Sequence, residues 1–146
     1  MVYHQILVPL DGSLLSEYIL PKMERFAAAF ESKLTLLHVV SAEDMEATSL
    51  TPSQKKARAD IVRYLQGVED SLARRGLKAQ WTLRCGDPAE EIAWYVDRHE
   101  VDLVIMSTHR QGEACERHVG SVAAETLKRI TIPVVLLKVP EAIAKL

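Results

Sequence analysis

Residues that can bind a nucleotide stand at two places where the sequence predicts the end of a strand or the start of a helix. Asp11 directly follows the apolar run Gln5–Leu10, and Gly120 and Ser121 open a predicted helix. A carboxylate can accept hydrogen bonds from a ribose hydroxyl or an exocyclic amine, whereas a helix N-terminus offers backbone N–H groups to a phosphate. Both positions also suit plain helix caps, because Asp and Ser are common N-cap residues.

The polar segment before Gly120 favours phosphate binding over simple capping. It runs for thirteen residues, from Ser107 to Val119, and it follows the buried apolar run Val101–Met106. A connection from a strand to a helix usually has about 2–6 residues. A loop at the carboxyl end of a parallel strand that leads into a helix N-terminus is where α/β proteins hold phosphates.

Nitrogen and sulfur ligands in the same segment raise the alternative of a metal site. His109, Cys115 and His118 lie in it, and Cys85 ends a predicted strand. Their spacing matches no zinc-finger or zinc-ribbon pattern, and no base can be placed beside Cys115 to make it a nucleophile. We therefore predict no metal site, and His38, within an apolar run, is interpreted as a core or crevice histidine.

No catalytic motif is found elsewhere in the chain. The sequence has no Walker A loop, no G-x-G-x-x-G, no nucleophile elbow and no H-E-x-x-H. We therefore predict that the protein is not an enzyme, and we assign no catalytic residue. This interpretation leaves room for weak ATP hydrolysis.

Short apolar runs alternate along the chain with segments of helical periodicity. The predicted strands are residues 5–10, 34–40, 79–85, 101–106 and 134–139, the third nearest a sheet edge because it alternates most. The predicted inner helix faces are Leu15, Ile19, Met23, Phe26 and Phe30; Ala57, Ile61, Leu65, Val68 and Leu72; Ile92, Ala93 and Val96; and Ala123, Leu127 and Ile130. This alternation predicts one α/β domain over residues 1–146, an open five-stranded parallel sheet with helices on both faces. Its ligand site is expected outside the carboxyl ends of the first and fourth strands.

Proline, glycine and capping residues predict where the helices begin and end. Pro21 lies inside the first helical pattern and should bend or break that helix. Thr51 precedes Pro52 as an N-cap, and Gly76 ends the same helix. Asp87, between Gly86 and Pro88, is predicted to cap the next helix.

Composition excludes several classes of protein. The 146 residues are 48% hydrophobic and 26% charged, which is typical of a soluble globular domain. The net charge of -2 comes without a basic block, so nucleic acid is not an expected partner. The two cysteines suggest no disulfide framework, and the first apolar run is too short for a signal peptide or a membrane span. A cytoplasmic protein without a membrane partner is expected.

Several sequence blocks, taken in order, identify a family. They are Ile6–Ser13; Leu36–Val39; Gly86–Pro88 with Glu91 and Ile92; Asp102–Met106 with Thr108 and His109; and Gly120–Ala123 with Pro133 and Val134. Over nearly its whole length the chain resembles the universal stress protein family.

The resemblance implies the architecture and the assembly. It implies strand order 3-2-1-4-5 in an adenine nucleotide alpha-hydrolase-like fold, and a homodimer built by pairing of the last strands. ATP-binding members carry G-x2-G-x9-G-[ST] after the fourth strand, and the corresponding residues here are Ser107, Arg110, Gly120 and Ser121. The last two match the pattern. If the family conformation at this position has a positive φ, Arg110 in place of Gly would cost about 1 kcal/mol or more. Gly112 could then supply the flexibility that is lost. The Arg110 side chain would either block a nucleotide or contact its phosphates.

The predicted nucleotide site combines these positions. Its residues are Pro9, Leu10, Asp11, Val39, Met106, Ser107, His109, Arg110, Gly112, Gly120, Ser121 and Val122. By resemblance, Asp11 and the backbone of Val39 would contact adenine and ribose, and the later residues would hold ribose and phosphates. The expected function is a stress-response module that binds ATP or AMP, with or without Mg²⁺, without efficient catalysis. The alternatives are a homodimeric partner-binding module that binds no nucleotide and, ranked last, an ATP hydrolase or nucleotidyl transferase.

Overall fold

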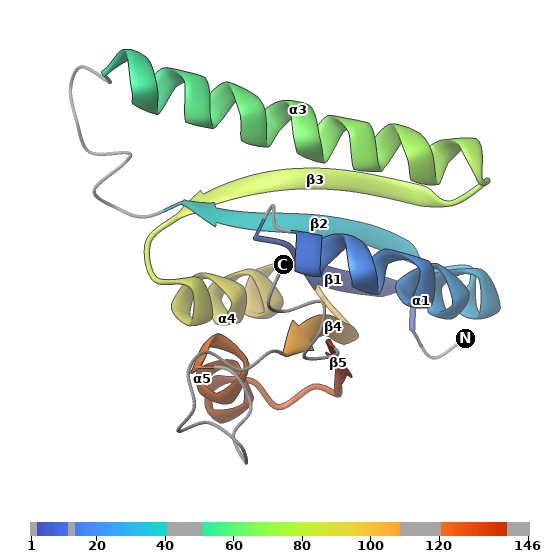
Figure 1. Ribbon diagram of the computed structural model, residues 1–146. Helices are drawn as coiled ribbons and strands as arrows, with labels where there is room; N and C mark the ends of the chain where they lie inside the picture. The colour runs from blue at the N-terminus through green and yellow to red at the C-terminus, as the bar shows by residue number, and fades with distance from the viewer. Residues whose placement is uncertain (1–2, 12–13, 41–50, 109–120, 140–146) are drawn as a thin grey trace.

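A computed structural model describes residues 3–11, 14–40, 51–108 and 121–139, and for residues 14–17 it describes the backbone alone. The elements alternate between strand and helix as predicted (Figure 1). In chain order they are β1 (Gln5–Pro9), α1 (Leu14–Phe30), β2 (Lys33–Val40), α3 (Pro52–Arg74), β3 (Lys78–Cys85), α4 (Pro88–Arg98), β4 (Leu103–Thr108), α5 (Ser121–Arg129) and β5 (Val134–Lys138). No helix in the described ranges is long and apolar enough to cross a membrane.

The five strands form one parallel sheet in the order β3-β2-β1-β4-β5, which confirms the predicted topology. β1 lies at its centre, where Ile6 is in register with Leu34 of β2 and Leu103 of β4. Because all strands run the same way, their carboxyl ends share one edge of the sheet, which is the side of the β2 and β3 arrowheads in Figure 1. β3 and β5 are the two outer strands.

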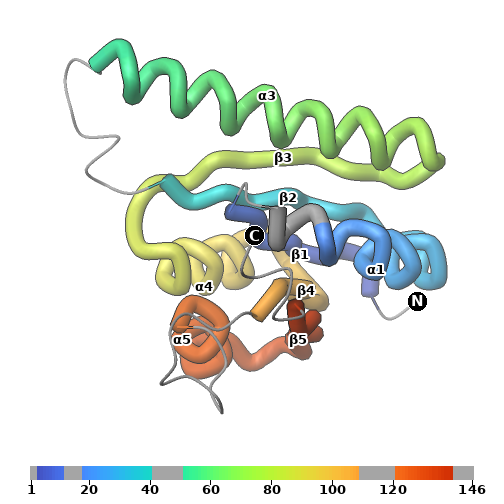
Figure 2. The backbone as a smooth tube through the Cα atoms, viewed as in Figure 1, coloured from blue at the N-terminus to red at the C-terminus, as the bar shows by residue number. Residues whose placement is uncertain are grey.

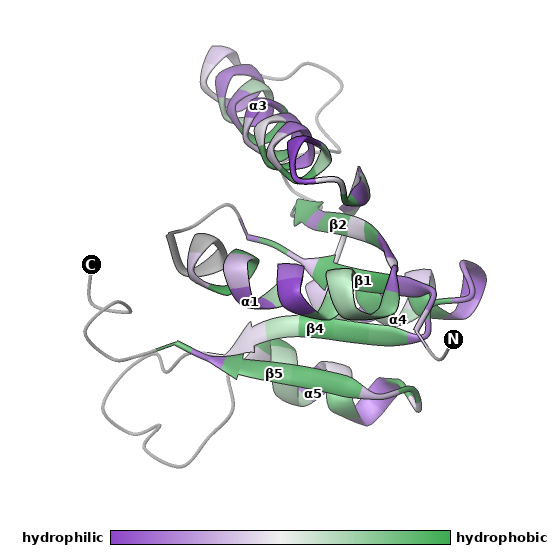
Figure 3. Ribbon diagram, turned by 90° about the vertical axis from the view of Figure 1, so that its right-hand side faces the viewer, coloured by the Kyte–Doolittle hydropathy of each residue, from purple (hydrophilic) through white to green (hydrophobic). Residues whose placement is uncertain are grey.

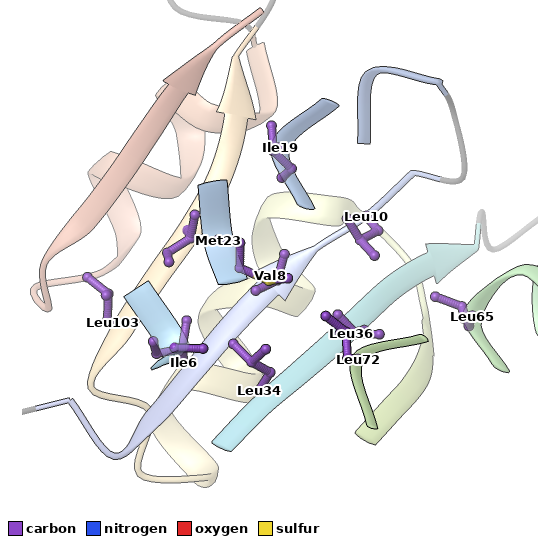
Figure 4. Close-up of a cluster of buried hydrophobic side chains, with 12 residues drawn as sticks. Ile6, Val8, Leu10, Ile19, Met23, Leu34, Leu36, Leu65, Leu72 and Leu103 are labelled. Carbon is purple, nitrogen blue, oxygen red and sulfur yellow. The ribbon is translucent and has the colours of Figure 1, made fainter. Parts of the chain in front are cut away.

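Helices cover both faces of the sheet (Figures 1 and 2). On one face, Ile19 and Met23 of α1 and Leu65 of α3 pack against Val8 and Leu36, and all five side chains are fully buried (Figure 4). Each such burial is worth about 1.5–3 kcal/mol relative to an exposed side chain. This cluster joins the two helices to the central strands.

The second face carries a separate core. Ile92 and Val96 of α4 and Ala123 of α5 pack against Leu7 and Val104. Leu7 and Val8 are sequence neighbours in different clusters, because successive side chains of a strand point to opposite faces. The central strands are therefore apolar on both sides, as their sequences predict, and the hydropathy colouring of β1 and β4 shows this (Figure 3).

The predicted helix ends at Thr51, Gly76 and Asp87 are confirmed. Thr51 and Gln54 form a capping box, in which the Thr51 hydroxyl accepts from the Gln54 N–H at 3.2 Å and the Gln54 side chain accepts from the Thr51 N–H at 2.8 Å. Gly76 has a φ of 81°, a left-handed conformation that favours glycine. The Asp87 carboxylate accepts from the Glu90 N–H at 3.1 Å.

The predicted break at Pro21 is wrong, because α1 runs unbroken through it. Proline removes one backbone hydrogen bond and crowds the preceding turn, at a cost of about 3 kcal/mol in a helix interior. Pro21 lies on the exposed side, whereas Ile19, Met23 and Ala27 are fully buried around it. Burial of these neighbours keeps the helix on the sheet despite the proline.

Two residues predicted on inner helix faces are exposed. Leu127 of α5 is 45% exposed, and Thr126 beside it is fully buried, with its hydroxyl donating to the Val122 carbonyl at 2.7 Å. Ala57 is exposed near the start of α3. A helix of 23 residues is about 34 Å long and a strand of 8 residues about 26 Å, so α3 extends past β3 (Figure 1).

Candidate functional site

The order of the strands reverses between β1 and β4, which are direct neighbours in the parallel sheet. From β1 the chain passes through α1 to β2 on one side, and from β4 it passes through α5 to β5 on the other. α1 and α5 lie in opposite layers. Beyond the carboxyl ends of two such strands the connections part, and α/β proteins bind ligands at this point. The predicted site lies outside the carboxyl ends of β1 and β4, and we refer to this region as the crevice.

Leu10 is held firmly at the end of β1. Its backbone N–H donates to the Leu37 carbonyl at 2.8 Å, and its carbonyl is 2.8 Å from Nδ1 of His38. A carbonyl can only accept, so Nδ1 of His38 carries the hydrogen and donates. The Leu10 side chain is 3% exposed. Both backbone groups and the side chain of Leu10 are thus fixed, and Asp11 follows at an exposed position.

The backbone of Val39 faces the same crevice. Along a strand of a parallel sheet, successive residues direct their N–H and C=O groups to opposite neighbours. The Leu37 carbonyl bonds to Leu10 on the β1 side, and the Val40 carbonyl accepts from Gly86 at 2.9 Å on the β3 side. Val39 therefore directs its backbone groups to the β1 side, beyond the last residue of that strand.

The β4 side of the crevice is formed by Met106, Ser107 and the start of α5. Met106 is 4% exposed and belongs to the core, so any contact it makes with a ligand comes from its backbone. Ser107 is half-buried. Ser121 is the first residue of α5 and is exposed, and Val122 is 37% exposed. A helix start carries partial positive charge, which suits a phosphate.

Four predicted site residues, His109, Arg110, Gly112 and Gly120, lie outside the described residues. Cys115 and His118 lie outside them too. Within the described ranges, no group of three His, Cys, Asp or Glu side chains could hold a metal ion. The choice between a blocking and a phosphate-binding Arg110 stays a prediction.

A fixed arginine at the end of β3 was missed by the sequence analysis. Nε of Arg84 lies 2.9 Å from a carboxylate oxygen of Glu91, and its guanidinium stacks on the Trp94 ring, 3.7 Å from the centroid. Arg84 is in register with Val39. An Arg at the end of a strand and a Glu in the first turn of the next helix are a weak sequence signal, because only the fold brings them together.

Comparison with known proteins gives consistent matches over the chain. A model described as the universal stress protein family matches residues 2–138. Universal stress protein MJ0577 of Methanocaldococcus jannaschii is 22% identical over 156 residues, covering 94% of this chain and 96% of that protein. Its solved structure superposes with a TM-score of 0.76 at 23% identity, over 97% of this chain and 99% of that one.

Two further similar structures contain nucleotides. A universal stress protein in complex with cAMP has a TM-score of 0.72 at 20% identity and covers 94% of this chain and 98% of that one. The universal stress protein from Archaeoglobus fulgidus in complex with dAMP has a TM-score of 0.68 at 16% identity, over 93% and 98% of the two chains. At these identities the structural likeness establishes the fold.

Proposed function

The chain belongs to the universal stress protein family, and we propose that it is a cytoplasmic stress-response module that binds an adenine nucleotide, ATP or AMP, without efficient turnover. The observation that carries the proposal is the reversal of strand order between β1 and β4. There the fixed Leu10 backbone leads into the exposed Asp11. Support comes from the two similar proteins solved with cAMP and dAMP.

The base and ribose contact the β1 and β2 side of the crevice. An adenine edge has both donors and acceptors, which the N–H and C=O groups of Val39 can match. The Asp11 carboxylate accepts from a ribose hydroxyl or the exocyclic amine, and such charge-assisted bonds are stronger than neutral ones. The hydrogen bonds that fix Leu10 reduce the conformational freedom that Asp11 loses on binding.

The phosphates contact the start of α5. The Ser121 hydroxyl and the first N–H groups of this helix suit anionic oxygens. Mg²⁺, when present, arrives on the phosphates, because it commonly binds to phosphate oxygens and water with few protein ligands. Among the described crevice residues, Asp11 is the one carboxylate, and Nδ1 of His38 is committed to the Leu10 carbonyl.

Isothermal titration with ATP and with AMP tests the proposal, comparing the wild type with Asp11→Ala. Loss of a charge-assisted hydrogen bond should weaken binding about tenfold or more. Asp97→Ala, which removes an exposed carboxylate on α4, is the matched control and should bind as the wild type does. Absence of binding heat for both nucleotides at millimolar concentration would contradict the proposal.

The second candidate is a homodimeric partner-binding module that binds no nucleotide, and β5 favours it. This outer strand carries Val134, Val135, Leu136 and Leu137, all half-buried, so it is apolar on both faces. An apolar strand at a sheet edge is a template for pairing with another chain. A stable dimer that shows no thermal shift with either nucleotide would favour this candidate over the first.

A further inference from the structure

A hollow lies at the amino end of the sheet, at the other end of the strands from the predicted nucleotide site. Its volume is about 170 Å³, and its polar lining residues are Gln5, Lys33, Thr35, Gln80, Tyr95 and His99. The first four belong to the starts of β1, β2 and β3, and the last two to the end of α4. In Figure 1 this is the end of the strands opposite the arrowheads of β2 and β3.

Strand register explains why polar side chains gather there. Gln5 is in register with Lys33, and Thr35 with Gln80. These residues share the α4 face of the sheet, because alternate side chains of a strand point the same way. The same alternation gives that face of β3 the polar set Lys78, Gln80, Thr82 and Arg84, whereas Ala79, Trp81 and Leu83 pack into the core under α1 and α3.

The hollow combines two buried polar residues, Thr35 and Tyr95, with the half-buried Gln5 and Lys33 and the exposed Gln80 and His99. Thr35 is 4% exposed, and its hydroxyl oxygen accepts from Nε2 of Gln80 at 3.2 Å. Tyr95 is 7% exposed, and its ring stacks on the His99 ring with centroids 3.9 Å apart and planes at 16°. Val101, which is 7% exposed and belongs to the core on the α4 side, adds an apolar wall. Such a site is preorganised, which lowers the entropy cost of holding a ligand.

The donors in this hollow favour an anion. Lys33 has three N–H donors, the two glutamines add amide donors, and none of the described lining residues carries a carboxylate. Asp102, which follows a lining residue in sequence, accepts instead from the backbone N–H groups of His4 and Gln5 at 2.8 and 2.9 Å. The partial negative charge at the end of α4 is offset by Arg98 in its last turn.

The volume sets the size of the ligand. A water molecule occupies about 30 Å³ of liquid volume, so the hollow has room for about five or six waters. A group of that size with several acceptor oxygens matches the donors. We infer that the hollow at the amino end of the sheet binds a small oxyanion, such as phosphate or a short carboxylate, with Lys33 as its charge partner.

Titration of ¹⁵N-labelled protein with inorganic phosphate, and separately with acetate, at constant ionic strength tests the inference. Backbone amide shifts should saturate at Gln5, Lys33, Thr35 and Gln80, with a dissociation constant in the millimolar range for at least one of the two anions. Lys33→Gln should weaken that binding about tenfold, since it removes a charge-assisted contact. Lys56→Gln, on α3 and exposed, is the matched control and should leave the affinity unchanged.

Tyr95→Phe provides a second variant, because it keeps the ring stacked on His99 and removes one hydroxyl donor. It should weaken anion binding about threefold or more. If thermal melting shows that Lys33→Gln is unfolded, the Tyr95 variant tests the inference in its place. Three outcomes would overturn the inference. The amide shifts do not saturate, they are equal in the Lys33 and Lys56 variants, or they map to Asp11 and Ser121 instead.

Discussion

At the scale of single residues, the main feature of the crevice is a hydrogen bond from the His38 side chain to the backbone of Leu10. Beyond the end of β1, the Leu10 carbonyl is bonded by Nδ1 of His38 at 2.8 Å. His38 and Leu10 are far apart in sequence, and their contact exists only because β1 and β2 pair in parallel. His38 therefore fixes the peptide that presents Asp11, and we expect it to be a positioning residue for the nucleotide.

Replacement of His38 tests this role. His38→Phe keeps a ring of similar size but removes the donor, so the Leu10 carbonyl loses its partner. We expect unfolding to become easier by about 1–2 kcal/mol and nucleotide affinity to fall about threefold to tenfold. His38→Asn, whose side-chain amide can donate from nearly the same position as Nδ1, should recover most of the affinity. Calorimetric titration and urea unfolding measure the two effects. A Phe variant that loses stability but binds ATP as the wild type does would show that His38 has only a structural role.

Sequence reasoning proposed the residues of this site but not the contacts among them and their neighbours. Asp11 and Ser121 were proposed because one follows a strand and the other opens a helix, which are local patterns, whereas Val39 was proposed from the family resemblance. The His38 contact with Leu10 and the contact of Arg84 with Glu91 and Trp94 depend on which strands become neighbours and in what register. Apolar periodicity fixes the face a residue takes but not its partner on the next strand.

At the scale of elements, periodicity predicted every described strand and helix, and it failed where packing outweighs local preference. Leu127 matches the helical pattern of α5 but is 45% exposed, and Thr126 is buried because its hydroxyl can bond within the helix, to the Val122 carbonyl. In α1, burial of Ile19, Met23 and Ala27 offsets a proline that local rules predict as a break. In both helices, tertiary packing outweighs the preference that the local sequence indicates.

The proline in α1 leads to a prediction on stability. Pro21 cannot donate to the Glu17 carbonyl four residues earlier, and its own side is exposed. Pro21→Ala restores that hydrogen bond and a residue of high helix propensity, so we expect unfolding to become harder by at least about 1 kcal/mol. Urea unfolding followed by circular dichroism measures the change. Ala28→Ser, an exposed substitution in the same helix, is the control and should cost less than about 1 kcal/mol. Lower stability of the Pro21 variant would show that the proline's effect on the unfolded chain dominates.

At the scale of the whole molecule, the two edges of the sheet differ. β3 is partly covered by α3 and has polar side chains on its other face. β5 is apolar on both faces and half-buried, and α5 beside it exposes Val122 and Leu127. Exposed apolar surface next to an outer strand is typical of an interface. The β5 side is therefore where we expect a second copy of the chain to pair.

The backbone of β5 shows which substitution would block such pairing. The Pro133 carbonyl accepts from Val104 and the Val139 N–H donates to Thr108, both at 3.1 Å, so odd-numbered residues of β5 face β4. Even-numbered residues direct their N–H and C=O groups outward.

Leu136→Pro removes an outward donor and should convert the dimer to a monomer in analytical ultracentrifugation, with β4 and β5 still paired. Lys138→Pro removes an outward donor at an exposed position and should weaken the dimer with less effect on the core. Leu137→Pro, one residue away, removes a donor that faces β4 and should lower the melting temperature more. A wild-type monomer at high micromolar concentration, or a Leu136→Pro variant that is folded and still dimeric, would exclude pairing through β5.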